Sequence, residues 1–139
     1  MLRRIIKKVK KLTRNYQTRK EGARLIDFCK KNKIIKLHFG CGPRILKGWI
    51  NIDLSFVPYV DKLYNYTDKY YPPEIRGTKD DFYAINITEV GLPLPDNSVD
   101  VIFHEDFIEH LDQRGQIIFL AETYRTLKPG SVHRVNTPD

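Results

Sequence analysis

The sequence predicts an α/β fold in which helices flank a mostly parallel sheet of about five strands. Three apolar runs predict the sheet. The first, over residues 34–39, leads into a Gly-Cys-Gly motif, and the second, over 49–54, holds a carboxylate near its end. The third, over 99–103, is nearly continuous, which is typical of a strand buried on both faces. This pattern is typical of a nucleoside site in a parallel sheet. Glycines after one strand let the backbone approach the ligand closely, and an acid at the end of the next strand accepts hydrogen bonds from ribose hydroxyls.

Composition bounds the class of protein. A chain of 139 residues suffices for one domain with a real core, and a mean hydropathy of −0.46 suits a soluble protein. The two cysteines, Cys29 and Cys41, lie in no Cys-x-x-Cys or His-rich pattern. We therefore expect a reduced, cytoplasmic protein without a metal site. No run approaches the ~18 apolar residues that a membrane span needs.

The formal charge of +7 is distributed unevenly along the chain. Residues 1–33 hold thirteen Lys and Arg against two acids, whereas residues 34–139 hold eleven bases against fifteen acids. This asymmetry predicts two parts, a basic N-terminal helical arm over 1–33 and a mildly acidic globular domain over 34–139.

The arm is predicted to contain two helices. Over residues 2–14, apolar side chains recur at helical spacing while lysines and arginines fill the other faces, which predicts a basic amphipathic helix of about three turns. A second helix is predicted over about 19–31, ending near Asn32. The first helix suits contact with an anionic membrane, and it equally suits a solvated helix that covers the sheet in place of a missing first crossover helix. Both interpretations stay open.

The globular part is predicted to alternate strands with loops and one long helix. The expected strands cover 34–39, 49–54, 82–87 and 99–103, with a fifth beginning at Val132. A turn-rich loop over 92–98 precedes the fourth strand because its prolines cannot continue a ladder. A helix is expected over 116–127, closed by the stop signal Lys128-Pro129-Gly130.

An aromatic-rich connection over 59–73 holds five tyrosines, Tyr59, Tyr64, Tyr66, Tyr70 and Tyr71. Aromatic rings stack on sugars and bases, so these tyrosines could form a platform for a substrate. We favour the alternative, in which the loop packs its rings over the sheet.

Four motifs occur in an order that resembles the class I S-adenosylmethionine-dependent methyltransferases, most closely their type 11-like group. A lone Gly-x-Gly is a weak signal, because most such pairs are turns. Four pieces in sequence over residues 34–139 are specific. They are Gly40-Cys41-Gly42 leading to Gly48-Trp49-Ile50-Asn51-Ile52-Asp53, the segment from Leu92 to Ile102, Ile108-Glu109-His110-Leu111, and Leu127-Lys128-Pro129-Gly130.

The resemblance implies a Rossmann-like fold and S-adenosylmethionine as the cofactor. Asp53 resembles the family's ribose-binding acid, and Asn86 and Ile87 stand where the family contacts adenine. His104 and Glu105 are expected just past the fourth strand, facing the same crevice. The full set of cofactor-binding residues that the resemblance implies is Phe39, Gly40, Cys41, Gly42, Asp53, Leu54, Asn86, Ile87, His104 and Glu105.

The chain departs from the family's pattern in three places. Many relatives carry an acid where this chain has His38, and a neutral imidazole supplies no fixed negative charge. The gap from Gly42 to Asp53 is short for a crossover helix, so we expect a loop there. The family fold continues with two more strands after the fifth, and this chain stops at Asp139. We favour a fragment or a truncated gene product over another way of pairing that sheet edge.

Four titratable side chains after the fourth strand are candidates for a general base, Glu105, Asp106, Glu109 and His110. Methyl transfer from a sulfonium depends mainly on positioning, but a protonated oxygen or nitrogen acceptor also needs its proton removed. His110 has the best-matched ordinary pKa, and Glu105 is the second candidate. The alternative is structural, since Glu109 and His110 also suit the start of a helix.

The leading hypothesis for function is therefore an S-adenosylmethionine-dependent methyltransferase acting on a small molecule, a glycan or a lipid-linked sugar. The resemblance also implies a place in polysaccharide biosynthesis. The alternative is a truncated, catalytically inactive module that binds the cofactor or a partner. His104-Glu105-Asp106-Phe107 stands where a base methyltransferase has Asn/Asp-Pro-Pro-Tyr/Phe, which argues against nucleic acid. Ile45 replaces the third glycine of a dinucleotide fingerprint, which argues against NAD.

Overall fold

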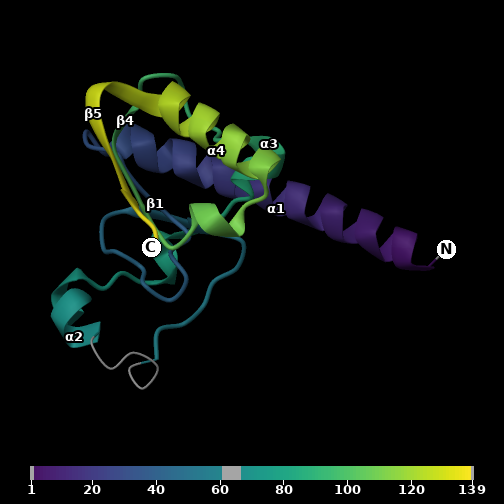
Figure 1. Ribbon diagram of the computed structural model, residues 1–139, viewed down its shortest axis with the longest axis horizontal. Helices are drawn as coiled ribbons and strands as arrows, with labels where there is room; N and C mark the ends of the chain where they lie inside the picture. Colours follow the sequence, from purple (N-terminus) through teal and green to yellow (C-terminus); the bar gives the residue numbers. More distant parts are fainter. Residues whose placement is uncertain (1, 61–66, 139) are drawn as a thin grey trace.

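The computed structural model contains a five-stranded parallel sheet in the order β3-β2-β1-β4-β5 (Figure 1). The structure describes residues 2–60 and 67–138. The predicted fold class is confirmed. The strands are β1 (Lys36–Phe39), β2 (Ile50–Asp53), β3 (Phe82–Ala84), β4 (Val99–Glu105) and β5 (Leu127–Asn136). The helices are α1 (Leu2–Lys31), α2 (Thr67–Tyr70), α3 (Ile87–Val90) and α4 (Gln113–Thr126), with 3-10 turns at Pro73–Ile75, Lys79–Asp81 and Ile108–His110.

Side chains alternate along each strand, so the sheet has two distinct faces. On the helical face, Leu37 and Phe39 share one core with Leu25 of α1 and Phe119 of α4. The opposite face, which we call the loop face, carries His38 of β1 and Phe103 of β4. It is covered by the β1–β2 and β2–β3 connections rather than by long helices, as Figure 1 shows.

The β1–β2 connection, residues 40–49, contains no helix, as the short gap predicted. Cys41 and Ile45 of this loop pack against Phe82 and Ala84 of β3 on the loop face. α1 lies on the other face of the sheet, so it does not stand in for the missing crossover helix.

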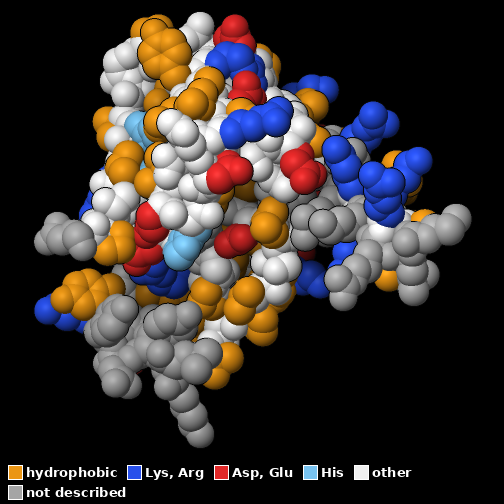
Figure 2. Space-filling view, turned by 45° about the vertical axis from the view of Figure 1, so that its right-hand side comes forward, with side chains coloured by type: hydrophobic (Ala, Val, Ile, Leu, Met, Phe, Trp, Pro, Cys, Tyr) orange, Lys and Arg blue, Asp and Glu red, His pale blue; other side chains and the backbone are white. Residues whose placement is uncertain are grey.

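The predicted pair of N-terminal helices is wrong, because α1 is one continuous helix. The sequence contains no glycine or proline before Gly22, so nothing interrupts the backbone hydrogen bonds between the two predicted segments. The second half of α1 packs on the sheet. The first half projects from the body (Figure 1). Lys and Arg side chains gather on this half (Figure 2).

Several strand boundaries also differ from the prediction. β3 ends at Ala84, three residues before the expected end, and Ile87 begins α3. β4 extends to Glu105, two residues beyond the expected end, because its pairing with β1 and β5 continues. β5 begins at Leu127, directly after α4, so the expected stop signal Lys128-Pro129-Gly130 lies inside a strand. β5 is the edge of the described sheet, where a proline removes no ladder hydrogen bond on the outer side.

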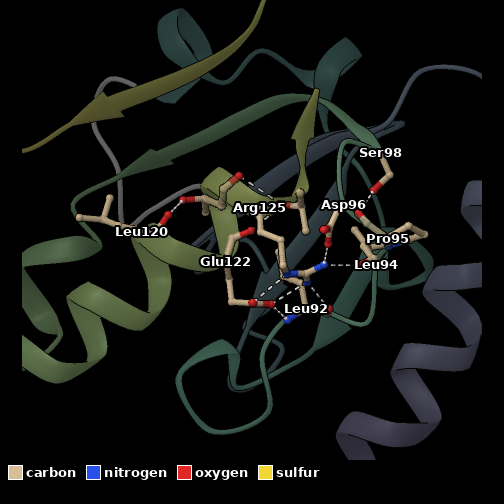
Figure 3. Close-up of polar contacts among 10 residues, drawn as sticks. Leu92, Leu94, Pro95, Asp96, Ser98, Leu120, Glu122 and Arg125 are labelled. Carbon is tan, nitrogen blue, oxygen red and sulfur yellow. Dashed lines mark hydrogen bonds and ion pairs between the residues drawn. The ribbon is translucent and has the colours of Figure 1, made fainter. Parts of the chain in front are cut away.

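Arg125 of α4 clamps the turn-rich loop before β4 (Figure 3). Its guanidinium donates to the carbonyl oxygens of Leu92 and Leu94 at 3.0 and 2.8 Å and pairs with Asp96 at 2.8 Å. Glu122, one turn earlier, pairs with Arg125 at 2.8 Å and accepts from the Leu92 amide at 2.7 Å. Helix α4 thus fixes the path by which the chain enters β4.

Candidate functional site

A cavity of about 660 Å³ opens on the loop face, at the carboxyl ends of β1 and β4. This is where open parallel sheets bind their ligands. Its walls come from the ends of β1, β4 and β5, from the β1–β2 loop, and from the segment around α2. Its lining includes His38, Gly42, Arg44, Phe103, Glu105 and Arg134.

The two glycines of the Gly-Cys-Gly motif serve different purposes. Both have positive φ, +61° at Gly40 and +49° at Gly42, which an L side chain rarely adopts. A β-carbon on Gly40 would lie 2.6 Å from the ring of Phe107, so this glycine is required by packing. A β-carbon on Gly42 would meet no atom within 4 Å, so the space beside it is open to a ligand.

Asp53 ends β2 beside this loop and holds it. One carboxylate oxygen accepts from the Gly42 amide at 3.0 Å, and the other accepts from the Leu54 amide at 2.7 Å. Each oxygen keeps a further lone pair for another donor, since a carboxylate accepts about four hydrogen bonds. Asp53 therefore stabilises the turn at Gly42 and retains acceptor capacity.

His38 lines the cavity as a neutral imidazole in a defined tautomer. Its ring is buried, and it stacks on Phe103 with the ring centroids 5.0 Å apart. Burial lowers the pKa of His38 to about 4. The Asn51 side-chain oxygen accepts from the Leu46 amide at 2.8 Å and lies 3.0 Å from His38 Nδ1. Because that oxygen only accepts, Nδ1 carries the proton and Nε2 keeps a free lone pair.

Asn51 is a structural residue that sequence reasoning missed. Its side chain is fully buried, and its amide nitrogen donates to carbonyl oxygens of Leu46, Trp49 and Asp81 at 2.9–3.1 Å. It therefore ties the β1–β2 loop to β2 and to the turn before β3. The signal was available, since a polar residue between Ile50 and Ile52 in a buried strand needs internal partners.

Arg44 and Glu105 form an ion pair at the cavity, with Arg44 Nη1 2.6 Å from Glu105 Oε2. Asn136 of β5 donates to the other oxygen of Glu105 at 2.7 Å. Glu105 is thus a paired carboxylate that joins the β1–β2 loop to the sheet. Arg44 was not predicted as a site residue, because its partner lies 61 positions away in the chain.

The model of the methyltransferase domain family matches residues 37–135, which include the cavity's glycines, His38 and Glu105. The chain belongs to this family. It is also similar to a probable S-adenosylmethionine-dependent methyltransferase of Mycolicibacterium smegmatis, with 50% identity over 48 residues. Those residues are 34% of this chain and 18% of that protein, so the match spans a small part of the relative.

S-adenosylmethionine is the methyl donor that the family and the relative's name imply for this methyltransferase domain. The residues at the cavity fit such a group. The position beside Gly42 is open, and the cavity presents charges of both signs. Asp53 does not itself line the cavity, but it accepts from the amide of Gly42, which does, and it keeps acceptor capacity for hydroxyl groups. A zwitterionic ligand with a ribose needs all three.

The predicted cofactor residues of the methyltransferase domain fall into separate groups. Gly40, Cys41, Gly42 and Glu105 line the cavity. Cys41 is buried, and burial raises the pKa of its thiol far above the usual range. Leu54 and Asn86 border a separate hollow of about 20 Å³, where the Asn86 side-chain oxygen accepts from the Thr88 hydroxyl at 2.8 Å.

The side chains of three other predicted cofactor residues, Phe39, Ile87 and His104, lie in the core of the helical face. The expectation that His104 faces the crevice past the fourth strand is wrong. His104 lies inside β4, where alternation directs its side chain opposite to that of Glu105. Its ring packs edge-on against Phe119, with the centroids 5.2 Å apart. Ile87 begins α3 instead of ending a strand.

The four candidate bases do not form one cluster. Glu105 and Asp106 line the cavity, while Glu109 and His110 are exposed on the 3-10 turn Ile108–His110 and do not line it. The turn separates them from the strand end. The structure therefore leaves Asp106, which has a positive φ of 49° and an exposed side chain, as the unpaired acid nearest the cavity's mouth among these four.

Two described rings of the tyrosine-rich connection pack against the β1–β2 loop and against each other rather than on the strands. Tyr71 is buried and donates its hydroxyl to the carbonyl oxygen of Ile45, and Tyr59 packs edge-on against it at 5.3 Å. Tyr70 and Tyr71 both line the cavity, so a platform for a substrate stays a prediction. Tyr64 and Tyr66 lie outside the described residues.

Proposed function

We propose that this methyltransferase domain binds S-adenosylmethionine in the cavity beside Gly42 and transfers its methyl group to a small-molecule or glycan acceptor. The observation that carries the proposal is the open position at Gly42, at the carboxyl ends of β1 and β4. When bound, the donor supplies a methyl group activated by a sulfonium charge.

The chain's own residues would position the ligand rather than activate it. Gly42 admits the ligand close to the backbone, and Asp53 offers acceptors to ribose hydroxyls. His38, neutral and held by Asn51, offers the Nε2 lone pair to a donor such as an ammonium group. The Arg44–Glu105 pair fixes the loop, so that the site is formed before the ligand arrives.

An acceptor bearing a sugar suits the outer part of the cavity. Tyr70 and Phe103 supply aromatic surface, and Arg134 lies over the Phe103 ring with its guanidinium carbon 5.3 Å from the centroid. Aromatic rings stack on sugars, and a guanidinium binds phosphate or carboxylate groups. We extend the proposal to the acceptors of polysaccharide biosynthesis and to the cytoplasm, where the unpaired thiols of Cys29 and Cys41 would stay reduced.

The alternative is a module that binds the cofactor without catalysing transfer. Measuring donor binding and the release of S-adenosylhomocysteine separately, over a panel of sugar acceptors, distinguishes the two. Binding with turnover on any acceptor supports the proposal, while binding without turnover on every acceptor supports the module.

Substituting Gly42→Ala tests where the donor binds. A methyl group there occupies the open position, so we expect donor affinity, measured by calorimetric titration, to fall at least about tenfold, an affinity change of about 1.4 kcal/mol. Gly48→Ala is the matched control. Gly48 also has positive φ, +71°, and open space around it, but it does not line the cavity. Equal losses in both variants would place the donor elsewhere.

A further inference from the structure

Helix α1 carries two apolar or small-residue stripes that face different ways. The first is formed by Thr18, Gly22, Leu25 and Cys29, at intervals of four, three and four residues, and packs on the sheet. Leu25 is fully buried, and a β-carbon on Gly22 would lie 3.2 Å from Pro93. This stripe anchors the second half of α1 to the domain.

The second stripe lies on the first half of the helix and is exposed. Its members are between 45% and 74% accessible, far more than core residues of the same types: Ile5, Ile6, Val9, Leu12 and Tyr16. Tyr16 is the last residue of the exposed stripe, and Thr18 is the first residue of the stripe that packs on the sheet. Two residues of an α-helix turn by about 200°, so these two side chains point in nearly opposite directions. The exposed stripe therefore points away from the direction in which the other stripe meets the sheet, and Figure 1 shows this half projecting from the body.

The same half of the helix is strongly basic. Residues 1–20 contain nine Lys and Arg and no Asp or Glu. Lys8 and Lys10 are exposed and flank the stripe, about 100° to either side of Val9. Arg4 and Lys11, also exposed, lie on the opposite side of the helix. Figure 2 shows the Lys and Arg side chains gathered over this projecting end.

We propose that residues 4–16 of α1 bind the surface of an anionic lipid bilayer. The exposed stripe enters the boundary between headgroups and acyl chains, and the Lys and Arg side chains reach the lipid phosphates. The domain stays on the aqueous side, because the stripe faces away from the sheet. This inference does not depend on the proposed function.

Two other partners fit the surface less well. A second copy of the helix would bring two clusters of positive charge together, with no acid among residues 1–20 to offset the repulsion. A nucleic acid would use the basic side but leave the exposed apolar stripe in water. A bilayer uses both sides at once.

Co-sedimentation of the full chain with vesicles tests the proposal. The vesicles are pure phosphatidylcholine or phosphatidylcholine with about 30% phosphatidylglycerol, whose anionic surface supplies the expected attraction. The test variant is Val9→Gln with Leu12→Gln, which removes apolar surface without changing charge. The control is Ile117→Gln with Leu120→Gln on α4, which replaces exposed apolar side chains of similar size.

We expect the unaltered chain and the control to bind anionic vesicles and the test variant to bind at least about tenfold more weakly, since each buried CH₂ contributes about 0.8 kcal/mol. All three should bind pure phosphatidylcholine weakly. Undiminished binding by the test variant would overturn the proposal, because the contact would then be electrostatic alone, as with a nucleic acid. So would an equal loss in the control, or a dimer of the unaltered chain that the test variant abolishes in sedimentation equilibrium.

Discussion

Two buried histidines on neighbouring strands illustrate how strand alternation assigns chemistry to residues. His38 faces the cavity, and Asn51 fixes its tautomer. His104 faces the helical core, where neither ring nitrogen has a hydrogen-bond partner among the described residues. Burial lowers the pKa of each to about 4, so both are neutral at pH 7. Only His38 is placed to meet a ligand.

These histidines predict how stability depends on pH. The imidazole pKa is about 6.5 in the unfolded chain, so between pH 6.5 and about 4 the unfolded state binds more protons. The free energy of unfolding should therefore fall as the pH is lowered from 6.5 to 5, by up to about 2 kcal/mol for each histidine at 1.36 kcal/mol per pKa unit. Urea denaturation at several pH values measures this.

Replacing His104 tests the assignment. His104→Phe removes the unpaired ring nitrogens from an aromatic cluster with Phe107 and Phe119, so we expect a gain of about 1 kcal/mol at pH 7 and a shallower loss toward pH 5. The control is His110→Gln, at an exposed histidine, which should leave the free energy of unfolding at pH 7 unchanged. A less stable His104→Phe protein at pH 7, with an unchanged pH slope, would contradict the assignment.

Connections between elements carry much of the tertiary order in this small fold. The β1–β2 loop is held by buried hydrogen bonds of Asn51 in place of helix packing. Asp100 of β4 joins three strands, since it accepts from the Ile35 amide before β1 at 2.8 Å and pairs with Lys128 of β5 at 2.6 Å. These two contacts lower the pKa of Asp100. Side-chain hydrogen bonds and ion pairs thus fix the position of the loops in this domain, as backbone hydrogen bonds fix the strands.

Arg125 predicts the cost of losing one such connection. Arg125→Met keeps the aliphatic stem but removes the contacts to Leu92, Leu94 and Asp96, so we expect a loss of about 2–3 kcal/mol, which is typical of hydrogen bonds to charged groups. Urea denaturation measures it. Arg114→Met, at an exposed arginine on the same helix, should cost less than about 0.5 kcal/mol. Equal losses of unfolding free energy in the two variants would mean that the contacts of Arg125 with the loop do not stabilise the fold.

Across the whole molecule, local sequence patterns predicted the features that are set by residues close together in the sequence. The five predicted strand segments all overlap strands of the sheet, although β5 begins earlier than expected, and the Gly-Cys-Gly motif located the cavity. The partners of Asn51 and Arg44 were not predictable in this way, because they are set by tertiary contacts. His104 shows how a small error spreads: ending β4 two residues early placed this side chain in the crevice, whereas the longer strand turns it to the opposite face.

The described molecule has a cavity of about 660 Å³ at the carboxyl edge of the sheet and a basic helix whose first half projects from the domain. No helix in the described part of the chain is long and apolar enough to cross a membrane. The cavity and the exposed stripe of α1 involve different residues. Gly42→Ala should therefore weaken donor binding alone, and Val9→Gln with Leu12→Gln should weaken lipid binding alone.

Calorimetric titration of the chain with S-adenosylmethionine and, separately, with NAD tests the central claim most directly. A cavity beside Gly42, whose turn is held by Asp53 and which lacks the third glycine of a dinucleotide site, predicts saturable binding of S-adenosylmethionine at one site per chain and no saturable heat with NAD. Binding of NAD without binding of S-adenosylmethionine would contradict it.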